Sequence, residues 1–256
     1  MNLIFIYSIR LLAVLASLAM FAWPLFVQVS MQSEINLAQS VFIALMPLIV
    51  ILLLAEFSSG NLGSRQLAIL GVLTALNAVV RMLGAGTGGI ETAFFLIILG
   101  GFVFGSSFGF ILGSTSLLVS ALITGGVGPW LPFQMMAAAL VGFGAGLLPR
   151  FAKTGLQIST LVAYAIFASF VYGSLMTLWN WPLIAGTGSD VSYLPAGGIL
   201  ENLTRFIRYE IVTGGLLWDA GRAITTVLLL LIAGPALLAT LRRVASKAGF
   251  SKKALV

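Results

Sequence analysis

Residues 66–83 read QLAILGVLTALNAVVRML, an apolar run of the length that crosses a membrane as a single helix. Small side chains recur along this run at Ala68, Gly71, Ala75 and Ala78, with steps of three, four and three residues. These steps place all four on one face of the helix. Small residues let a second helix approach closely, and that helix belongs either to the same chain or to a partner subunit.

The rest of the chain has the same apolar character. Of its 256 residues, 60% are hydrophobic and 8% are charged, whereas a soluble domain carries about 25% charged residues. The sequence therefore predicts an all-α polytopic membrane helix bundle, and the fourth run is short enough to need shielding by its neighbours. The eight expected spans are Leu11–Val27, Ala38–Ala55, Gln66–Leu83, Thr92–Gly105, Phe108–Thr124, Phe133–Leu148, Leu156–Trp179 and Arg222–Leu241.

The ends of the chain are expected on the same side of the membrane. Arg10 before the first run is also typical of a signal peptide, but no small-residue cleavage site follows, so a first membrane helix is favoured. An even number of spans puts both termini together. With the termini in the cytoplasm, nine of the thirteen Lys and Arg lie inside, as the positive-inside rule requires. The outer four are Arg81, Arg205, Arg208 and Arg222.

The residue types exclude much chemistry. There is no cysteine and no histidine, so thiol catalysis, disulfides and Cys/His metal sites are excluded. No phosphate-binding loop of the Gly-Lys-Ser/Thr kind is present, and no carboxylate is apparent inside a span. The net charge is +6, but the chain has no soluble stretch long enough to form a basic face that binds nucleic acid. We expect no metal, no cofactor, no nucleic-acid partner and no enzyme activity.

Polar and aromatic residues gather at the outer ends of the spans. Arg81, with Asn77 one turn before it, is either a functional residue at membrane depth or a side chain that extends to the lipid headgroups. The outer loop 84–91 is glycine-rich and ends in Glu91. Trp130 and Gln134 follow Gly125-Gly126-Val127-Gly128-Pro129. The alternative interpretation is that Trp130 belongs to the aromatic belt at the membrane surface. Three such segments on one side suggest an outward-facing pocket, and the third is Asn180-Trp181-Pro182.

The longest outer segment, 180–221, contains a second pattern. From Ile199 to Trp218, apolar residues recur at helical spacing with charged residues between them. This pattern predicts an amphipathic helix on the membrane surface or over a cavity.

From about Arg65 to the C-terminus, the chain resembles the substrate-binding S components of energy-coupling-factor (ECF) vitamin transporters. The resemblance is carried by 66–81, by the short glycine-rich hairpin at Gly105-Ser106-Ser107, and by GPWLPFQM at 128–135. The last stretch is similar to that of members assigned to cobalamin. The resemblance implies a six-helix core at 61–256, preceded by two additional transmembrane helices at 1–60.

The resemblance also implies a function. An S component captures a micronutrient outside a prokaryotic cell, and here the best match is cobalamin or a related corrinoid. It delivers this ligand with a transmembrane coupling subunit and two cytoplasmic ATPases in the plasma membrane. The face that meets the coupling subunit corresponds to Ala68, Gly71, Ala75 and Ala78. The capping loops correspond to 84–91, 125–133 and 180–221. The expected ligand-binding residues are Asn77, Arg81, Glu91, Trp130, Gln134, Asn180 and Trp181.

Two other classes remain open from the residues alone. A stand-alone channel or secondary carrier requires a polar path or a coupling ion inside the helices. A membrane enzyme requires a nucleophile with its base, or a set of metal ligands.

Overall fold

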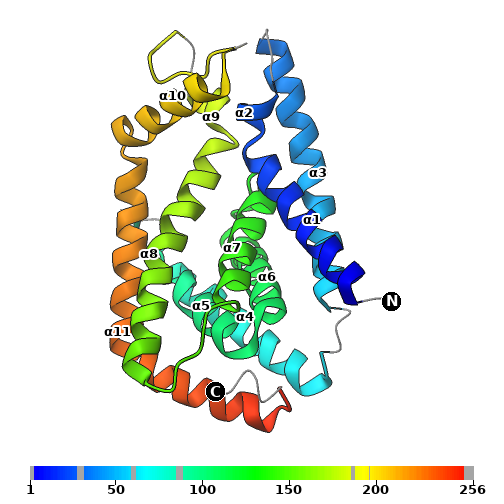
Figure 1. Ribbon diagram of the computed structural model, residues 1–256, viewed down its shortest axis with the longest axis vertical. Helices are drawn as coiled ribbons and strands as arrows, with labels where there is room; N and C mark the ends of the chain where they lie inside the picture. Colours follow the sequence, from blue (N-terminus) through cyan, green and yellow to red (C-terminus); the bar gives the residue numbers. More distant parts are fainter. Residues whose placement is uncertain are drawn as a thin grey trace.

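A computed structural model of the chain describes residues 3–27, 32–58, 62–84, 89–185, 188–195 and 197–250. Every regular element in these ranges is a helix, so the expected all-α bundle is confirmed (Figure 1). The helices are α1 (Leu3–Phe21), α2 (Trp23–Phe26), α3 (Gln32–Ser58), α4 (Ser64–Gly84), α5 (Ala93–Phe104), α6 (Ser106–Thr124), α7 (Leu131–Ala145), α8 (Thr154–Leu178), α9 (Trp181–Ile184), α10 (Ile199–Val212) and α11 (Gly215–Lys247).

Five of these helices, α3, α4, α6, α8 and α11, are long and apolar enough to cross a membrane. The chain is therefore membrane-embedded. The apolar helices α5 and α7 are shorter, with 12 and 15 residues. At a rise of about 1.5 Å per residue, α5 spans only about 18 Å. All 12 of its residues are buried, so its neighbours shield it from lipid, as its length requires.

The centre of the bundle is a contact between backbones. A Cβ built at Gly109 in α6 would overlap the carbonyl group of Gly142 in α7, and one built at Gly142 would overlap that of Gly109. Gly101 of α5 faces the same Gly142 carbonyl. Since none of these residues has a side chain, three helices meet at van der Waals distance. Gly105, with a φ of 101°, makes the expected tight turn between α5 and α6.

Helices α1 and α3 lie along one side of the bundle (Figure 1). The Phe57 ring of α3 packs on Phe110 of α6, with ring centres 4.6 Å apart. At the other end, the Trp23 indole donates a hydrogen bond to the carbonyl oxygen of Trp179 at 2.7 Å. The expected first span, Leu11–Val27, is not one helix. After a break at Ala22, the separate helix α2 begins at Trp23 with Pro24 in its first turn, because proline lacks the backbone donor that a continuous helix needs there.

Two boundaries in segment 180–221 also differ from expectation. The amphipathic helix expected from Ile199 to Trp218 ends at Val212 as α10. Gly214, with a φ of 79°, then turns the chain so that α11 begins at Gly215. The last span consequently starts seven residues before the expected Arg222. This earlier start brings Trp218, Asp219 and Arg222 onto the first two turns of α11.

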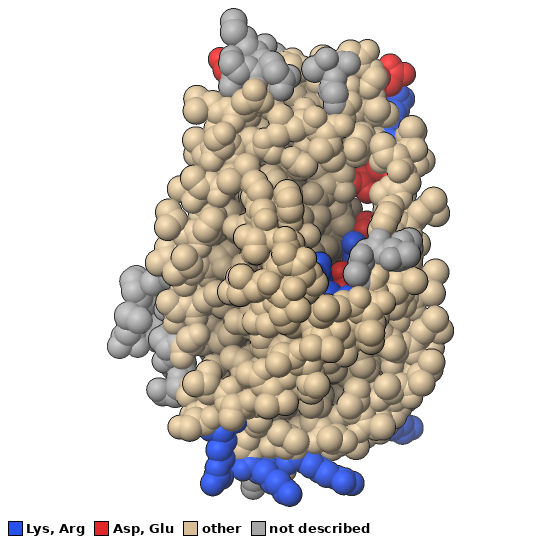
Figure 2. Space-filling model, turned by 180° about the vertical axis from the view of Figure 1, so that it is seen from behind, with Lys and Arg blue, Asp and Glu red and all other residues tan. Residues whose placement is uncertain are grey.

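Charge is distributed unevenly along the molecule. Lys and Arg gather at the lower end in Figure 2, where α11 terminates with Arg242, Arg243 and Lys247. Asp and Glu lie toward the opposite end, which carries α10, and charges of both signs occupy a hollow between the two ends. The separation of basic and acidic ends agrees with the charge pattern that the sequence predicts for the two sides of the bundle.

The glycine contact gives a first prediction. Gly142→Ala should lower the thermal unfolding temperature in detergent, because its Cβ must push α7 away from α6. Overpacking of this kind costs about 1–3 kcal/mol. Gly71→Ala is the matched control, since a Cβ there meets nothing within 4 Å and alanine favours a helix by about 0.5–1 kcal/mol. Equal stability of the two variants would contradict the proposed role of the contact.

Candidate ligand-binding cavity

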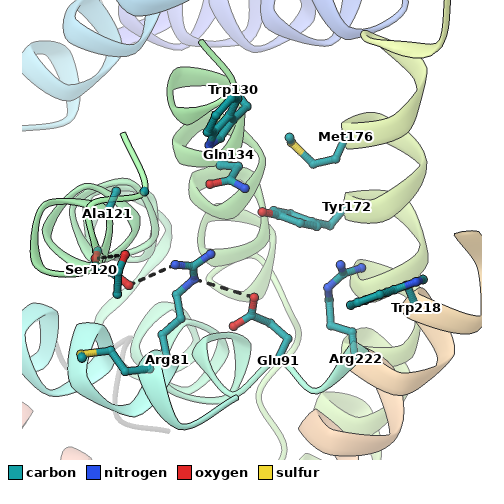
Figure 3. A pocket seen from close by; sticks show the side chains of 13 residues that line it. Arg81, Glu91, Ser120, Ala121, Trp130, Gln134, Tyr172, Met176, Trp218 and Arg222 are labelled. Carbon is teal, nitrogen blue, oxygen red and sulfur yellow. Dashed lines mark hydrogen bonds and ion pairs between the residues drawn. The ribbon is translucent and has the colours of Figure 1, made fainter. Parts of the chain in front are cut away.

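A cavity of about 460 Å³ lies where the end of α4, the segment before α5, the junction of α6 and α7, the C-terminal part of α8 and the start of α11 come together. Its walls carry four of the seven expected ligand-binding residues (Figure 3). The lining residues are Arg81, Met82, Glu91, Ser120, Ala121, Thr124, Gly126, Trp130, Gln134, Tyr172, Met176, Trp218 and Arg222. A charged cavity inside an apolar bundle is the leading candidate for a binding site.

Arg81 points into the centre of the cavity from the last turn of α4 (Figure 3). One guanidinium nitrogen donates a hydrogen bond to the Ser120 hydroxyl of α6 at 3.0 Å. The Nε atom lies 3.8 Å from the Glu91 carboxylate, too far for a hydrogen bond, and has no hydrogen-bond partner although it is buried. The other oxygen of Glu91 accepts the backbone N–H of Ala93 at 3.2 Å. Arg81 and Glu91 therefore attract each other electrostatically, but no hydrogen bond joins them.

A second ion pair closes the opposite wall. The Arg222 guanidinium donates to the Asp219 carboxylate at 2.5 Å and to the Ser169 carbonyl at 3.1 Å. It also lies 4.8 Å from the centre of the Tyr172 ring. Asp219 is only 2% exposed and occupies the space next to Gly173, where any Cβ would overlap its carboxylate. A carboxylate this deeply buried is stable only with a charged partner, and Arg222 is that partner.

Two tryptophans stand at the rim of the cavity, on different sides of it (Figure 3). Trp130 precedes α7, and its indole packs over Gly128, where a Cβ would collide with the ring. The backbone of Trp218 packs against Gly89 of the α4–α5 connection in the same way. Both side chains remain about half exposed. Gln134 projects from the first turn of α7 toward Arg81 (Figure 3).

Glu210 of α10 is a further buried carboxylate near this site, with 4% of its surface exposed. A Cβ at Gly215 would approach its carboxylate closely, so Glu210 packs against the start of α11. Burial raises the pKa of this carboxyl. The hydrogen-bonding Thr177 side chain lowers the pKa, and the charge of Asp219 raises it. Asp219 and Glu210 correct the expectation that the bundle contains no buried carboxylate.

The raised pKa makes stability depend on pH. Below the unfolded pKa of about 4.3, Glu210 is protonated in both states and imposes no penalty. As pH rises through the higher folded pKa, the buried carboxyl loses its proton and that stability is lost. Glu210→Gln should therefore unfold at a higher temperature than the parent chain near pH 7, and the difference should vanish near pH 4.

The matched control for this pH dependence is Glu201→Gln on the same helix. The Glu201 side chain is half exposed and forms a surface ion pair with Arg205 at 3.4 Å. Such pairs contribute little to stability, so the control should change the unfolding temperature only slightly at any pH. If Glu210→Gln unfolded at a lower temperature than the parent chain near pH 7, the ionised Glu210 would have a stabilising partner in the folded state. That result would contradict the prediction.

Three expected ligand-binding residues lie elsewhere. Asn77 is fully buried in α4, and neither its amide nitrogen nor its amide oxygen has a hydrogen-bond partner. Asn180 accepts a hydrogen bond from Gln39 of α3 at 2.8 Å. Trp181 is fully buried, and its indole donates to the Val191 carbonyl at 2.9 Å. Asn180 and Trp181 thus hold the connections at this end of the bundle together and do not line the cavity.

The expected partner-facing stripe is divided by the fold. Ala68, Gly71 and Ala75 are exposed on α4, between exposed apolar side chains such as Val72. Ala78 is fully buried instead, because it lies at the edge of the stripe nearest the buried face of the helix. The exposed face is therefore shorter than the sequence spacing predicts.

Several lining residues were not expected from the sequence. Tyr172 and Met176 belong to a long apolar run, and Ser120 to another, so hydropathy gives no sign of their position. The sequence identifies Arg222 only as a basic residue of the expected outer side. The spacing of Asp219 and Arg222, three residues apart on one helix, was the available signal, because residues at this spacing are neighbours.

No group of three or more His, Cys, Asp and Glu side chains that could hold a metal ion occurs within the described ranges. Comparison with known proteins gives no match, since no family model, curated protein or solved structure is significantly similar to this chain.

Proposed function

We propose that this chain is the substrate-capture subunit of an ECF-type importer in the plasma membrane of a prokaryote, with both termini in the cytoplasm. It binds a micronutrient from outside and delivers it with a transmembrane coupling subunit and two cytoplasmic ATPases. The observation that carries the proposal is the cavity, a group of charged and aromatic side chains enclosed by an otherwise apolar bundle. Charges are expensive to keep at such a place and mark a functional site.

The positions of the cavity walls support this assignment. Glu91 closes the 84–91 loop, Trp130 belongs to the 125–133 loop, and Trp218 lies within 180–221. These are the three segments that the S-component resemblance gives as capping loops. On the other side of α4, the exposed Ala68, Gly71 and Ala75 offer a smooth face to a coupling subunit.

The size of the cavity bears on the ligand. Drug-sized ligands occupy pockets of about 300–1,000 Å³, and this one measures about 460 Å³. A corrinoid, which the 128–135 stretch suggests, is far bulkier than ligands of that range. The cavity therefore favours a smaller micronutrient than cobalamin.

Binding without energy input tests the proposal. The purified full chain in detergent should bind one member of a vitamin panel, including cyanocobalamin, at equilibrium and without ATP. It should hydrolyse no ATP, because the sequence has no phosphate-binding loop of the Gly-Lys-Ser/Thr kind. Equilibrium dialysis against labelled vitamins measures the binding, and no binding across the whole panel would overturn the proposal.

The α4 face gives a separate prediction. Ala75→Leu should abolish co-purification with the coupling module, because the larger side chain keeps the two helices apart, while ligand affinity should stay unchanged. Ala75→Gly is the matched control and should retain assembly, although glycine costs about 1 kcal/mol in a helix. Parallel loss of binding and assembly in Ala75→Leu would indicate misfolding and contradict a coupling role.

Buried Asp219 favours one alternative, a secondary carrier that couples transport to protons. A proton-coupled carrier needs a carboxylate inside the membrane, and Asp219 is buried in α11, which is long and apolar enough to cross one. Proteoliposomes that contain only this chain decide between the two functions. Uptake driven by a pH gradient without any ATPase would establish the carrier.

A further inference from the structure

The hydrogen-bonding groups of the cavity show what a ligand must supply, and this inference rests on the proposed capture function. Three polar atoms at the site are buried without hydrogen-bond partners: Arg81 Nε, Arg222 Nε and Asp219 Oδ2. Native structures satisfy nearly all such groups. Asp219 and Arg222 already neutralise each other at 2.5 Å, so the less engaged pair, Arg81 and Glu91, is the part of the site that is open to a ligand.

Arg81 and Glu91 present a donor beside an acceptor. Arginine offers only N–H donors and an ionised carboxylate only acceptors. Both side chains line the cavity, and the Nε of Arg81 lies 3.8 Å from the Oε2 of Glu91 (Figure 3). The complementary chemical edge carries an acceptor next to an N–H, as the C=O and N–H of a lactam or ureide do. Such an edge can hydrogen-bond to both side chains at once.

The charges of the cavity add up to zero. Of the described residues that line it, Arg81, Glu91 and Arg222 are charged. Glu91 balances Arg81, and the buried Asp219, which lies behind the lining, balances Arg222 at 2.5 Å. A ligand with a net charge would leave an uncompensated charge in a partly buried site, which is costly. The balance therefore favours a ligand that is neutral overall and excludes a simple anion as the best fit.

The remaining lining favours a flat molecule. Trp130 and Trp218 offer indole faces at the rim, and Met176 and Ala121 add apolar surface to the lining (Figure 3). Flat rings stack well on such side chains. Tyr172 is fixed by an edge-to-face contact with Phe94, with ring centres 4.9 Å apart, and its hydroxyl points into the cavity (Figure 3).

We propose that the cavity binds a small, flat, uncharged heterocycle whose lactam or ureide edge accepts a hydrogen bond from Arg81 and donates one to Glu91. The ring system stacks between the aromatic side chains of the rim. Recognition thus depends on an N–H of the ligand, which an ionised vitamin carboxylate does not have.

A matched pair of probes tests the edge. Lumazine (pteridine-2,4-dione) is a fluorescent bicyclic ureide, and 1,3-dimethyllumazine has the same ring with both N–H groups blocked. Titrated into the purified full chain, lumazine should bind with a saturable fluorescence change. The dimethyl compound should bind about 10- to 100-fold more weakly, the usual effect of leaving a charged acceptor without its hydrogen bond.

Variants assign the preference to Glu91. Glu91→Met removes the acceptor, so the affinity ratio between the two probes should fall to about one, which a merely structural role for Glu91 would not produce. Glu91→Gln keeps an oxygen acceptor and should retain part of the ratio. Arg81→Met should weaken both probes together. Thr240→Ala, an exposed position on the far part of α11, is the control and should leave both affinities unchanged.

The outcomes separate this inference from the proposed function. Equal affinity for the two probes, no binding of lumazine, or an unchanged ratio in Glu91→Met would overturn the inference. If nicotinate or cyanocobalamin binds saturably where lumazine does not, the ligand class is wrong while the capture function stands. If no vitamin and no probe binds, both the inference and the proposed capture function fail.

Discussion

The approach of α6 to α7 at Gly109 and Gly142 is the constraint on which the rest of the structure depends. Side chains there would separate the two backbones, and association of helices in lipid relies on such close packing because burial from water gives no driving force. Ser120 lies farther along α6, and Gln134 lies two turns before Gly142 on α7. The spacing of the cavity walls is therefore set by residues that never touch a ligand.

The hydrophobic pattern predicts most of the architecture, because a membrane leaves the backbone few alternatives to helices. The short α5 and its turn at Gly105 follow from run length and glycine placement. The errors occur where local backbone chemistry overrides hydropathy. Pro24 divides the first span into α1 and α2, and Gly214 ends α10 and starts α11 early.

The candidate site was predicted in part, for a comparable reason. Arg81, Glu91, Trp130 and Gln134 stand out because polar or aromatic residues at the ends of apolar runs are conspicuous. Tyr172 stands inside a run, where sequence alone does not tell a lining side chain from a core one. Asn180 and Trp181 are also polar or aromatic residues at the end of an apolar run. Their side chains, however, hydrogen-bond to Gln39 and to the Val191 carbonyl and do not line the cavity. Only the tertiary arrangement separates these cases.

The pairing of two arginines with two carboxylates has a consequence for motion across an energised membrane. An elementary charge that crosses a membrane potential of 100 mV gains or loses about 2.3 kcal/mol. The four side chains Arg81, Glu91, Arg222 and Asp219 together carry no net charge when all are ionised. A voltage across the membrane therefore exerts no net electrical force on this group of residues.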